Sequence, residues 1–298
     1  MPFFRAILTF LMNYLHYQHL PLFLQPQKSG DSFSQCIHEF EILPSGSILR
    51  ADFIYTGSFL HAAQHFLQRG QLQTFRCVLA NPPFSLKNWG AEQFSSDIYG
   101  RNAWGTPTNS NGDFAWLQHM VASMDKNNWR LAVVLPQGVL FRGGKEGGIR
   151  KQLIESDKLE YVITLLGGVF YSSGVSVCIL ILSNNKPESH KGKVCFVDAS
   201  NIYTPQRAQN IMTEDNIMEV YSLCANYADV TEKARVATIN DIRDKNYTLS
   251  VSSYIAKAAR ESISPREVRE QFSAALSQAL SAEENLKTLL AERGYLHE

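Results

Sequence analysis

The clearest pattern along the chain is a series of short apolar runs, bounded by turn-forming residues, that begins near residue 76. The first run, 77–80, leads directly into Asn81-Pro82-Pro83 and predicts a buried strand that the prolines terminate. Four similar runs predict strands at 131–135, 161–166, 175–182 and 194–198. A weaker strand-like pattern lies at 247–250.

Between these runs, apolar residues recur at helical spacing. Residues 113–126 place Phe114, Leu117 and Val121 on one face, and Asp113 stands where a helix cap is expected. Further helices are predicted at 57–69, 147–157 and 266–293. Because apolar strands alternate with helices, we expect an α/β sheet covered by helices on both faces, followed by a long C-terminal helix.

The pattern at 266–293 repeats apolar residues every seven positions, as in Phe272, Ala279 and Leu286. Gly294 follows where a helix commonly ends. Two interpretations fit this pattern equally well. The helix packs on its own domain, or it binds a partner helix as in a coiled coil.

Composition restricts the class of protein. The chain has 298 residues, of which 45% are hydrophobic, and 28 basic side chains balance 28 acidic ones. These values exclude a disordered chain and a disulfide-dense scaffold. Zero net charge excludes nucleic-acid binding by bulk attraction, although it leaves room for a local basic patch.

The five cysteines are scattered, and none belongs to a C-x-x-C pair. This usage argues against a zinc cluster and favours a reducing compartment, for which we expect the cytoplasm. Residues 1–24 are apolar, but Arg5, Asn13 and His16 interrupt them. The segment therefore predicts a buried helix better than a signal peptide, and no membrane association is expected.

The tetrapeptide Asn81-Pro82-Pro83-Phe84 follows a predicted strand, and ligands bind at the carboxyl ends of strands in open α/β sheets. The Asn81 side-chain oxygen and the Pro82 carbonyl can both accept hydrogen bonds from one amine. Phe84 offers a flat surface on which a base can stack. This combination suits the exocyclic amine of a nucleobase, although Asn-Pro-Pro by itself often only forms a turn.

The segment 78–85 resembles the catalytic motif of N6-adenine DNA methyltransferases. The sequence that follows is similar to the modification subunit of type I restriction–modification systems over roughly residues 76–260. The shared segments are LKNWG at 86–90, YGR at 99–101, GTP at 105–107, NGDFAWLQHM at 111–120, AVVLPQGVLFRGG at 132–144, IR at 149–150 and KGKVCFVDAS at 191–200.

The resemblance implies a partial class I, Rossmann-like methyltransferase sheet. It implies that Asn81, Pro82, Pro83 and Phe84 hold an adenine flipped out of DNA, with Phe84 stacking on the base. It further implies S-adenosyl-L-methionine as methyl donor. The implied partners are DNA, a specificity subunit that reads the target sequence, and a restriction subunit that cuts.

One departure from the family concerns the donor. Family members carry a glycine-rich turn before the catalytic tetrapeptide, but no Gly-x-Gly pattern precedes residue 76 here. We therefore expect an atypical segment at 1–75 with the donor-binding half missing or replaced, a catalytic half at 76–260, and a possible partner-binding helix at 261–298. The chain resembles an N-terminally truncated subunit. The resemblance implies an adenine-specific DNA methyltransferase subunit, and the alternative is an inactive remnant that keeps the partner-binding scaffold.

Three weaker candidates remain. The basic, glycine-rich segment 142–150 could contact DNA phosphates through Arg142, Lys145 and Arg150, or simply cap the sheet as a solvated loop. Aromatic residues in 167–171 could flank a flipped base or belong to the core. His119 lies within a predicted helix without partners at metal spacing, which favours a structural role. Methylation of a protein or RNA amine would use the same tetrapeptide chemistry, and the extended resemblance argues against it.

Overall fold

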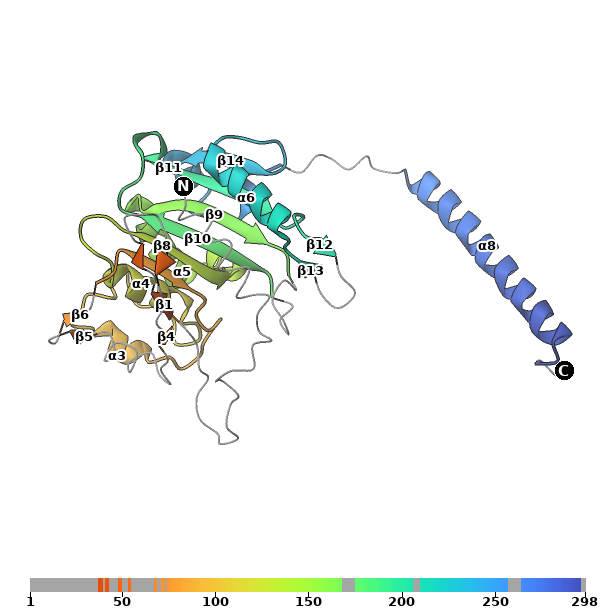
Figure 1. Ribbon diagram of the computed structural model, residues 1–298, viewed down its shortest axis with the longest axis horizontal. Coiled ribbons are helices and arrows are strands. Elements are labelled where there is room, and N and C mark those ends of the chain that lie inside the picture. The colour runs from red at the N-terminus through yellow and green to blue at the C-terminus, as the bar shows by residue number, and fades with distance from the viewer. Residues whose placement is uncertain are drawn as a thin grey trace, which may run out of the picture. The chain divides into compact units, whose positions relative to one another are not determined.

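The protein is represented by a computed structural model, which describes residues 74–167, 175–205, 210–256 and 264–295 together with six short strands before residue 73. The chain divides into two compact units, Met1–Ala256 and Lys257–Glu298. The first unit contains the sheet and the second contains one long helix (Figure 1).

The first unit is built on an eight-stranded mixed sheet with the order β14-β11-β9-β10-β8-β7-β1-β4. Parallel pairs join β7 to β8 and β9 to β11, whereas β10 runs antiparallel between β8 and β9. The strands of this sheet are β1 (Ile37–Glu39), β4 (Phe53–Ile54), β7 (Cys77–Ala80), β8 (Arg130–Pro136), β9 (Leu159–Leu165), β10 (Val177–Ser183), β11 (Lys193–Ala199) and β14 (Ala234–Thr238). Separate two-stranded ribbons pair β2 (Glu41–Ile42) with β3 (Ile48–Leu49), β5 (Leu67–Gln68) with β6 (Gln71–Leu72), and β12 (Thr204–Pro205) with β13 (Asn210–Ile211).

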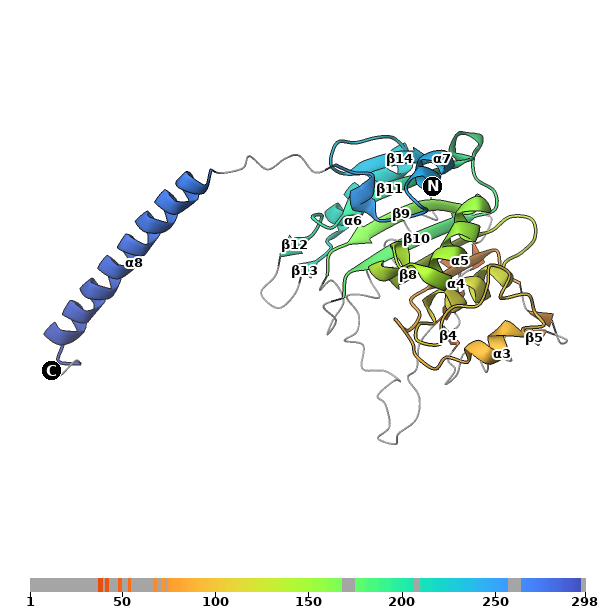
Figure 2. The same ribbon diagram turned by 180° about the vertical axis from the view of Figure 1, so that it is seen from behind.

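Helices cover both faces of this sheet, as expected. One face packs against α4 (Asp113–Ala122), α5 (Gly144–Glu155) and α7 (Ile239–Asp244), and the other packs against α6 (Glu214–Asn226). Figure 1 shows α6 across its face, and Figure 2 shows α4, α5 and α7 from behind. The short helix α3 (Ala91–Ser95) and the turns η1 (Gln137–Leu140), η2 (Glu188–His190) and η3 (Val251–Ser253) complete the described elements.

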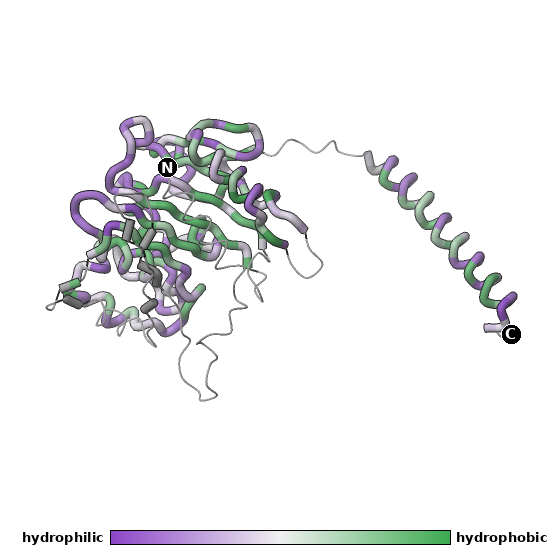
Figure 3. The backbone as a smooth tube through the Cα atoms, in the orientation of Figure 1, coloured by the Kyte–Doolittle hydropathy of each residue, from purple (hydrophilic) through white to green (hydrophobic). Residues whose placement is uncertain are grey.

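The alternation of side chains along the strands explains why the sheet is buried on both sides. Val78 and Ala80 belong to the core beside α4 and α5, whereas Cys77 and Leu79 belong to the core beside α6. Strands β9 and β10 are buried at every position. The apolar core strands are visible in Figure 3 as continuous hydrophobic stretches.

The five predicted apolar strands are confirmed as β7 to β11, and the helices predicted at 113–126 and 147–157 correspond to α4 and α5. Helix α5 begins at Gly144, three residues before the predicted start. The strand suggested by the pattern at 247–250 is not formed. Tyr247 belongs to a turn, and residues 248–250 lead without regular structure into η3.

Other predictions fall partly or wholly outside the described residues. The helix predicted at 57–69 is contradicted at Leu67–Gln68, which form strand β5, and the rest of it lies outside the described residues. The predicted N-terminal helix within 1–24 also lies outside them. Helix α6 was not predicted, although Thr213 and Asn216 form a capping box at its start.

The second unit is the helix α8 (Pro265–Glu292), which matches the prediction at 266–293. A capping box between Ser264 and Glu267 starts it. Its large apolar side chains are about half exposed or more, so the helix has a long exposed apolar surface. These side chains are Val268, Phe272, Leu276, Leu280, Leu286 and Leu289. Within the described residues, none of the helices combines the length and apolar content needed to cross a bilayer.

Candidate active site

The Asn81-Pro82-Pro83-Phe84 turn lies at the carboxyl end of β7, beside the parallel strand β8. The register pairs Ala80 with Val133, and β8 continues to Pro136, so the turn and the start of η1 share one edge of the sheet. Pro82 is buried, whereas Asn81, Pro83 and Phe84 are half-buried. The turn therefore occupies the edge where open α/β sheets bind ligands.

The side-chain oxygen of Asn81 is the most informative atom of this turn. Oδ1 is buried, and it has no hydrogen-bond partner among the described residues. A buried acceptor left unsatisfied destabilises a protein by about 1–3 kcal/mol. An N–H group that entered the site would satisfy it, so the turn offers an acceptor for a donor that the described residues do not supply.

Phe84 and Ser85 complete the turn. Phe84 is half-buried and packs against the core on the α6 face of the sheet. Ser85 has a φ of 52°, in the left-handed region that residues with a Cβ enter at a cost of about 1–2 kcal/mol. Such a conformation persists only where surrounding contacts impose it.

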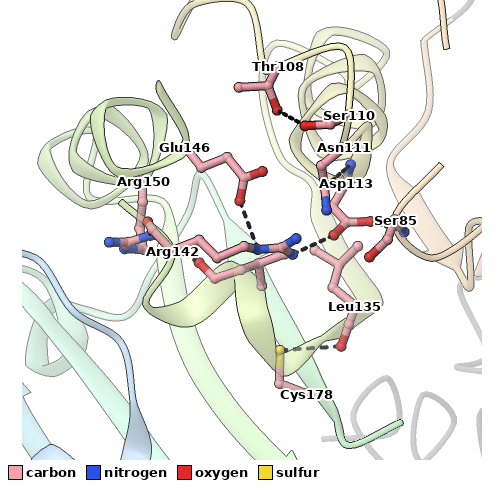
Figure 4. A network of polar contacts seen from close by, with 11 residues as sticks. Ser85, Thr108, Ser110, Asn111, Asp113, Leu135, Arg142, Glu146, Arg150 and Cys178 are labelled. Atoms are coloured by element: carbon pink, nitrogen blue, oxygen red, sulfur yellow. Dashed lines mark hydrogen bonds and ion pairs between the residues drawn. The ribbon is translucent and has the colours of Figure 1, made fainter. Parts of the chain in front are cut away.

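Asp113 supplies that contact. Its Oδ1 accepts a hydrogen bond from the Ser85 backbone N–H at 2.7 Å, and its Oδ2 accepts one from Arg142 Nη2 at 2.7 Å. Figure 4 shows the carboxylate between these two donors. The expected role of Asp113 as a helix cap is wrong: Gly112 is the cap residue, and Asp113, fully buried, is the first residue of α4.

Further hydrogen bonds fasten the rest of the loop to the segment before α4. The Leu86 carbonyl accepts from Gly112 N–H at 3.0 Å, and Asn88 N–H donates to the Asn109 carbonyl at 2.8 Å. Trp89 Nε1 donates to the Thr108 carbonyl at 2.8 Å. The loop after β7 is therefore held along its length by residues 108–113.

Arg142 links this loop to the segment that follows β8. Its Nε forms an ion pair with Glu146 Oε2 at 2.9 Å, in addition to the bond with Asp113. Burial raises the pKa of Glu146, an effect that the Arg142 charge opposes. Arg142 thus joins an acidic residue on α4 to one on α5 (Figure 4).

The phosphate-contact prediction for 142–150 fails for two of its three residues. Arg142 is engaged by two carboxylates, and Arg150 is buried with Nη1 donating to the Val139 and Arg142 carbonyls and Nε to the Tyr247 carbonyl. Of these three basic residues, only Lys145 is exposed. Most of the segment belongs to helix α5 and not to a loop, so its glycines do not prevent helix formation there.

The remaining predicted candidates contribute less. Most of 167–171 lies outside the described residues. His119 is buried within α4, and burial lowers the pKa of its imidazole to about 3, so the ring is neutral. In the described part of the chain, no group of three or more His, Cys, Asp or Glu side chains is arranged to hold a metal ion.

The described residues do not assemble a site for S-adenosyl-L-methionine. The neighbour of β7 on the side away from β8 is β1, which runs antiparallel: Ile37 pairs with Ala80 and Glu39 with Val78. The carboxyl end of β1 therefore points away from Asn81. In a doubly wound sheet the strand next to a ligand-binding strand is parallel and contributes its own carboxyl end.

Comparison with known proteins places this chain in a family. The N-6 DNA Methylase family matches residues 48–262, and the chain belongs to that family. The match begins before residue 76, where the resemblance was expected to start, so it includes part of the segment without a Gly-x-Gly pattern.

Individual relatives come from type I restriction enzymes. The MjaVII and MjaVIII methylase subunits of Methanocaldococcus jannaschii are each 33% identical, over 65% and 72% of this chain. The chain spans only 35% and 38% of the length of these two relatives. The methyltransferase subunit of a type I restriction–modification system from Streptococcus thermophilus has a similar structure, with a TM-score of 0.57 and 32% identity over 61% of this chain and 38% of that one.

Sequence reasoning missed the roles of Asp113, Arg142 and Glu146. Asp113 and Arg142 are 29 positions apart in sequence, and their contact depends on the parallel pairing of β7 with β8. The pattern of buried strands was the one signal in the sequence, because it predicts that the residues following β7 and β8 lie at the same edge of the sheet. That signal places the segments together without pairing individual side chains.

Proposed function

We propose that this chain provides the adenine-binding half of the site of an N6-adenine DNA methyltransferase, as part of a type I modification subunit. The observation that carries the proposal is the buried Oδ1 of Asn81 at the carboxyl end of β7, which has no hydrogen-bond partner in the part of the chain that the structure describes. Family membership and the type I relatives support the choice of substrate. Because a paired adenine cannot reach this edge, the base must leave the duplex.

In this proposal, Asn81 Oδ1 and the Pro82 carbonyl accept the two hydrogens of the adenine amine. Drawing both hydrogens out of the base plane favours a pyramidal nitrogen whose lone pair is available for attack. Pro83 keeps the turn rigid because its ring fixes φ. The ring of Phe84 stacks on the base. S-adenosyl-L-methionine is the donor that would supply the methyl group.

The proposed partners are DNA, a specificity subunit and a restriction subunit, in line with the names of the relatives. The exposed apolar side chains of α8 support a role for this helix in binding the specificity subunit. The four described cysteines are free and buried, which supports the cytoplasmic location expected from their spacing.

A second candidate function is that of a scaffold that keeps the adenine site and the partner-binding helix but transfers no methyl group. The antiparallel direction of β1 beside β7 favours it, together with the lack of a Gly-x-Gly pattern before residue 76. The two candidates differ in donor binding. An isolated chain that binds S-adenosyl-L-methionine with micromolar affinity in a calorimetric titration would exclude the scaffold.

The decisive experiment measures transfer of a tritium-labelled methyl group to DNA by the full chain mixed with its cognate specificity subunit. Genomic DNA amplified in vitro is the substrate, because it is unmethylated and contains every short target sequence. Transfer that disappears in Asn81→Ala supports the methyltransferase. No transfer, with the complex still forming, supports the scaffold. Transfer to RNA instead of DNA would overturn the proposed substrate.

A further inference from the structure

The network behind the tetrapeptide includes a residue whose two carboxylate oxygens are both occupied within the protein. Asp113 binds the Ser85 N–H with one oxygen and Arg142 with the other, and it is fully buried. Because it is buried and both oxygens are bonded within the protein, a substrate does not reach it. We infer that Asp113 and Arg142 form a positioning pair that fixes the Asn81–Phe84 turn for methyl transfer, an inference that rests on the proposed function.

The contact with Ser85 is well placed for this role. Ser85 directly follows Phe84, and its left-handed φ of 52° determines how the chain leaves the turn. The 2.7 Å bond from its N–H to Asp113 holds that conformation. The bond thereby fixes one end of the tetrapeptide, while the β7 ladder fixes the other end at Ala80. Asn81 Oδ1 lies between two anchored points.

Arg142 holds the second oxygen of Asp113 through an ion pair at 2.7 Å. Charge-assisted hydrogen bonds are roughly twice as strong as neutral ones. Arg142 is itself held by Glu146 through its side chain and by Arg150 through its backbone carbonyl. The position of the turn after β7 is therefore coupled to the segment after β8.

Gly138 offers a way to move Arg142 without changing any charged residue. A Cβ at this position would lie 2.8 Å from Arg142 Nε and 2.9 Å from its Cζ. Because the guanidinium is the end of a flexible side chain, Gly138→Ala should displace it from Asp113 while the fold persists. At Gly148, in α5, an added Cβ would meet no atom of another segment within 4 Å, so Gly148→Ala is the matched control.

The test compares Asp113→Ala, Asp113→Asn, Gly138→Ala and Gly148→Ala in the full chain with the specificity subunit. Hydrogen exchange of the peptide covering 82–88 reports on the turn, and labelled-methyl transfer to amplified genomic DNA gives kcat and KM. Asp113→Ala and Gly138→Ala should speed exchange at Ser85 and lower kcat about 100-fold, with KM for DNA changed by less than about threefold. Asp113→Asn, which keeps an acceptor for Ser85, should recover part of kcat, and Gly148→Ala should match the parent.

The outcomes separate this inference from the proposed function. Asn81-dependent transfer that is unaffected by Gly138→Ala and Asp113→Ala would overturn the positioning role and leave the function intact. Unchanged exchange at 82–88 in a folded Gly138→Ala chain would also overturn it. A parent chain without any transfer would overturn the proposed function, and the role in catalysis would fall with it. Losses of kcat that merely follow the melting temperature would show a structural role instead.

Discussion

The two ends of helix α5 hold glutamates in opposite electrostatic situations. Glu146, near the start, faces Arg142 at the candidate site, and its burial raises the pKa of the carboxyl group. Glu155, at the end, accepts hydrogen bonds from Arg243 and from the Tyr247 hydroxyl, which lower its pKa to about 2. We call the first the site end and the second the fastening end.

The difference fits the proposed functional role of the site end. At the fastening end, the ionised carboxylate is more stable in the fold than in the open chain. At the candidate site, which the site end faces, three features reduce stability: an Asn81 acceptor without a partner among the described residues, the left-handed backbone of Ser85 and the desolvated Glu146. Unfavourable groups of this kind concentrate at functional sites, where pre-organisation requires them.

The largest effect is expected at Asn81, where a substitution should lower activity without lowering stability. Asn81→Ala removes the proposed acceptor of the adenine amine, and losing one such electrostatic contact typically lowers a rate by about 10²–10³-fold. Its Oδ1 has no partner among the described residues, so the melting temperature should stay the same or rise. Thermal unfolding and labelled-methyl transfer on the same sample would check both. A large drop in melting temperature would contradict this account of the site end.

Arg150 joins the two ends, and its loss should reduce stability most. Its guanidinium donates to the Val139, Arg142 and Tyr247 carbonyls from a buried position. Arg150→Met keeps much of the volume but leaves these carbonyls without their donor, so the free energy of unfolding should fall by about 3 kcal/mol. Urea unfolding would measure this change.

Lys145 is the matched control, because it is exposed on the same helix. Lys145→Ala should change the free energy of unfolding by less than about 0.5 kcal/mol. If the two variants were equally stable, Arg150 would not be the link between the ends.

Phe84 should affect base binding more than stability, by a smaller amount than Asn81 affects the rate. Stacking of one base on an aromatic ring contributes about 1–3 kcal/mol. Phe84→Ala should therefore lower kcat/KM for DNA by about 10–100-fold, whereas Phe84→Trp should retain most of it. Equal losses in both variants would show that the ring supports the core and does not stack on a base.

The sequence predicted the core of the fold because the strands β7 to β11 are unbroken apolar runs, a local signal. It could not predict that β10 runs antiparallel between β8 and β9, since strand direction depends on packing. It placed Asn81 at a strand end for the same local reason. It misjudged Asp113 and Arg150 because the hydrogen-bond partners of their side chains are 8 to 97 positions away. For Arg142 it missed the pair with Asp113, 29 positions away. Long-range polar pairs leave no periodic pattern.

The smallest effect distinguishes the two glutamates of α5 by the sign of their pH dependence. Glu155 has a folded-state pKa of about 2, below the usual 4.5, so it stabilises the fold above pH 4.5 and loses this contribution as the pH falls toward 2. Glu155→Gln should therefore lower the melting temperature at pH 7, and the difference from the parent should shrink in acid.

Glu146 should behave in the opposite way, because its folded-state pKa lies above 4.5. Its ionisation then destabilises the fold, an effect that is absent below pH 4.5 and develops as the pH rises through the folded-state pKa. Glu146→Gln should raise the melting temperature at pH 7 and match the parent in acid. Thermal unfolding of both variants between pH 3 and 7 checks the pair. If both substitutions shifted the melting temperature in the same direction at pH 7, the contrast between the site end and the fastening end would not hold.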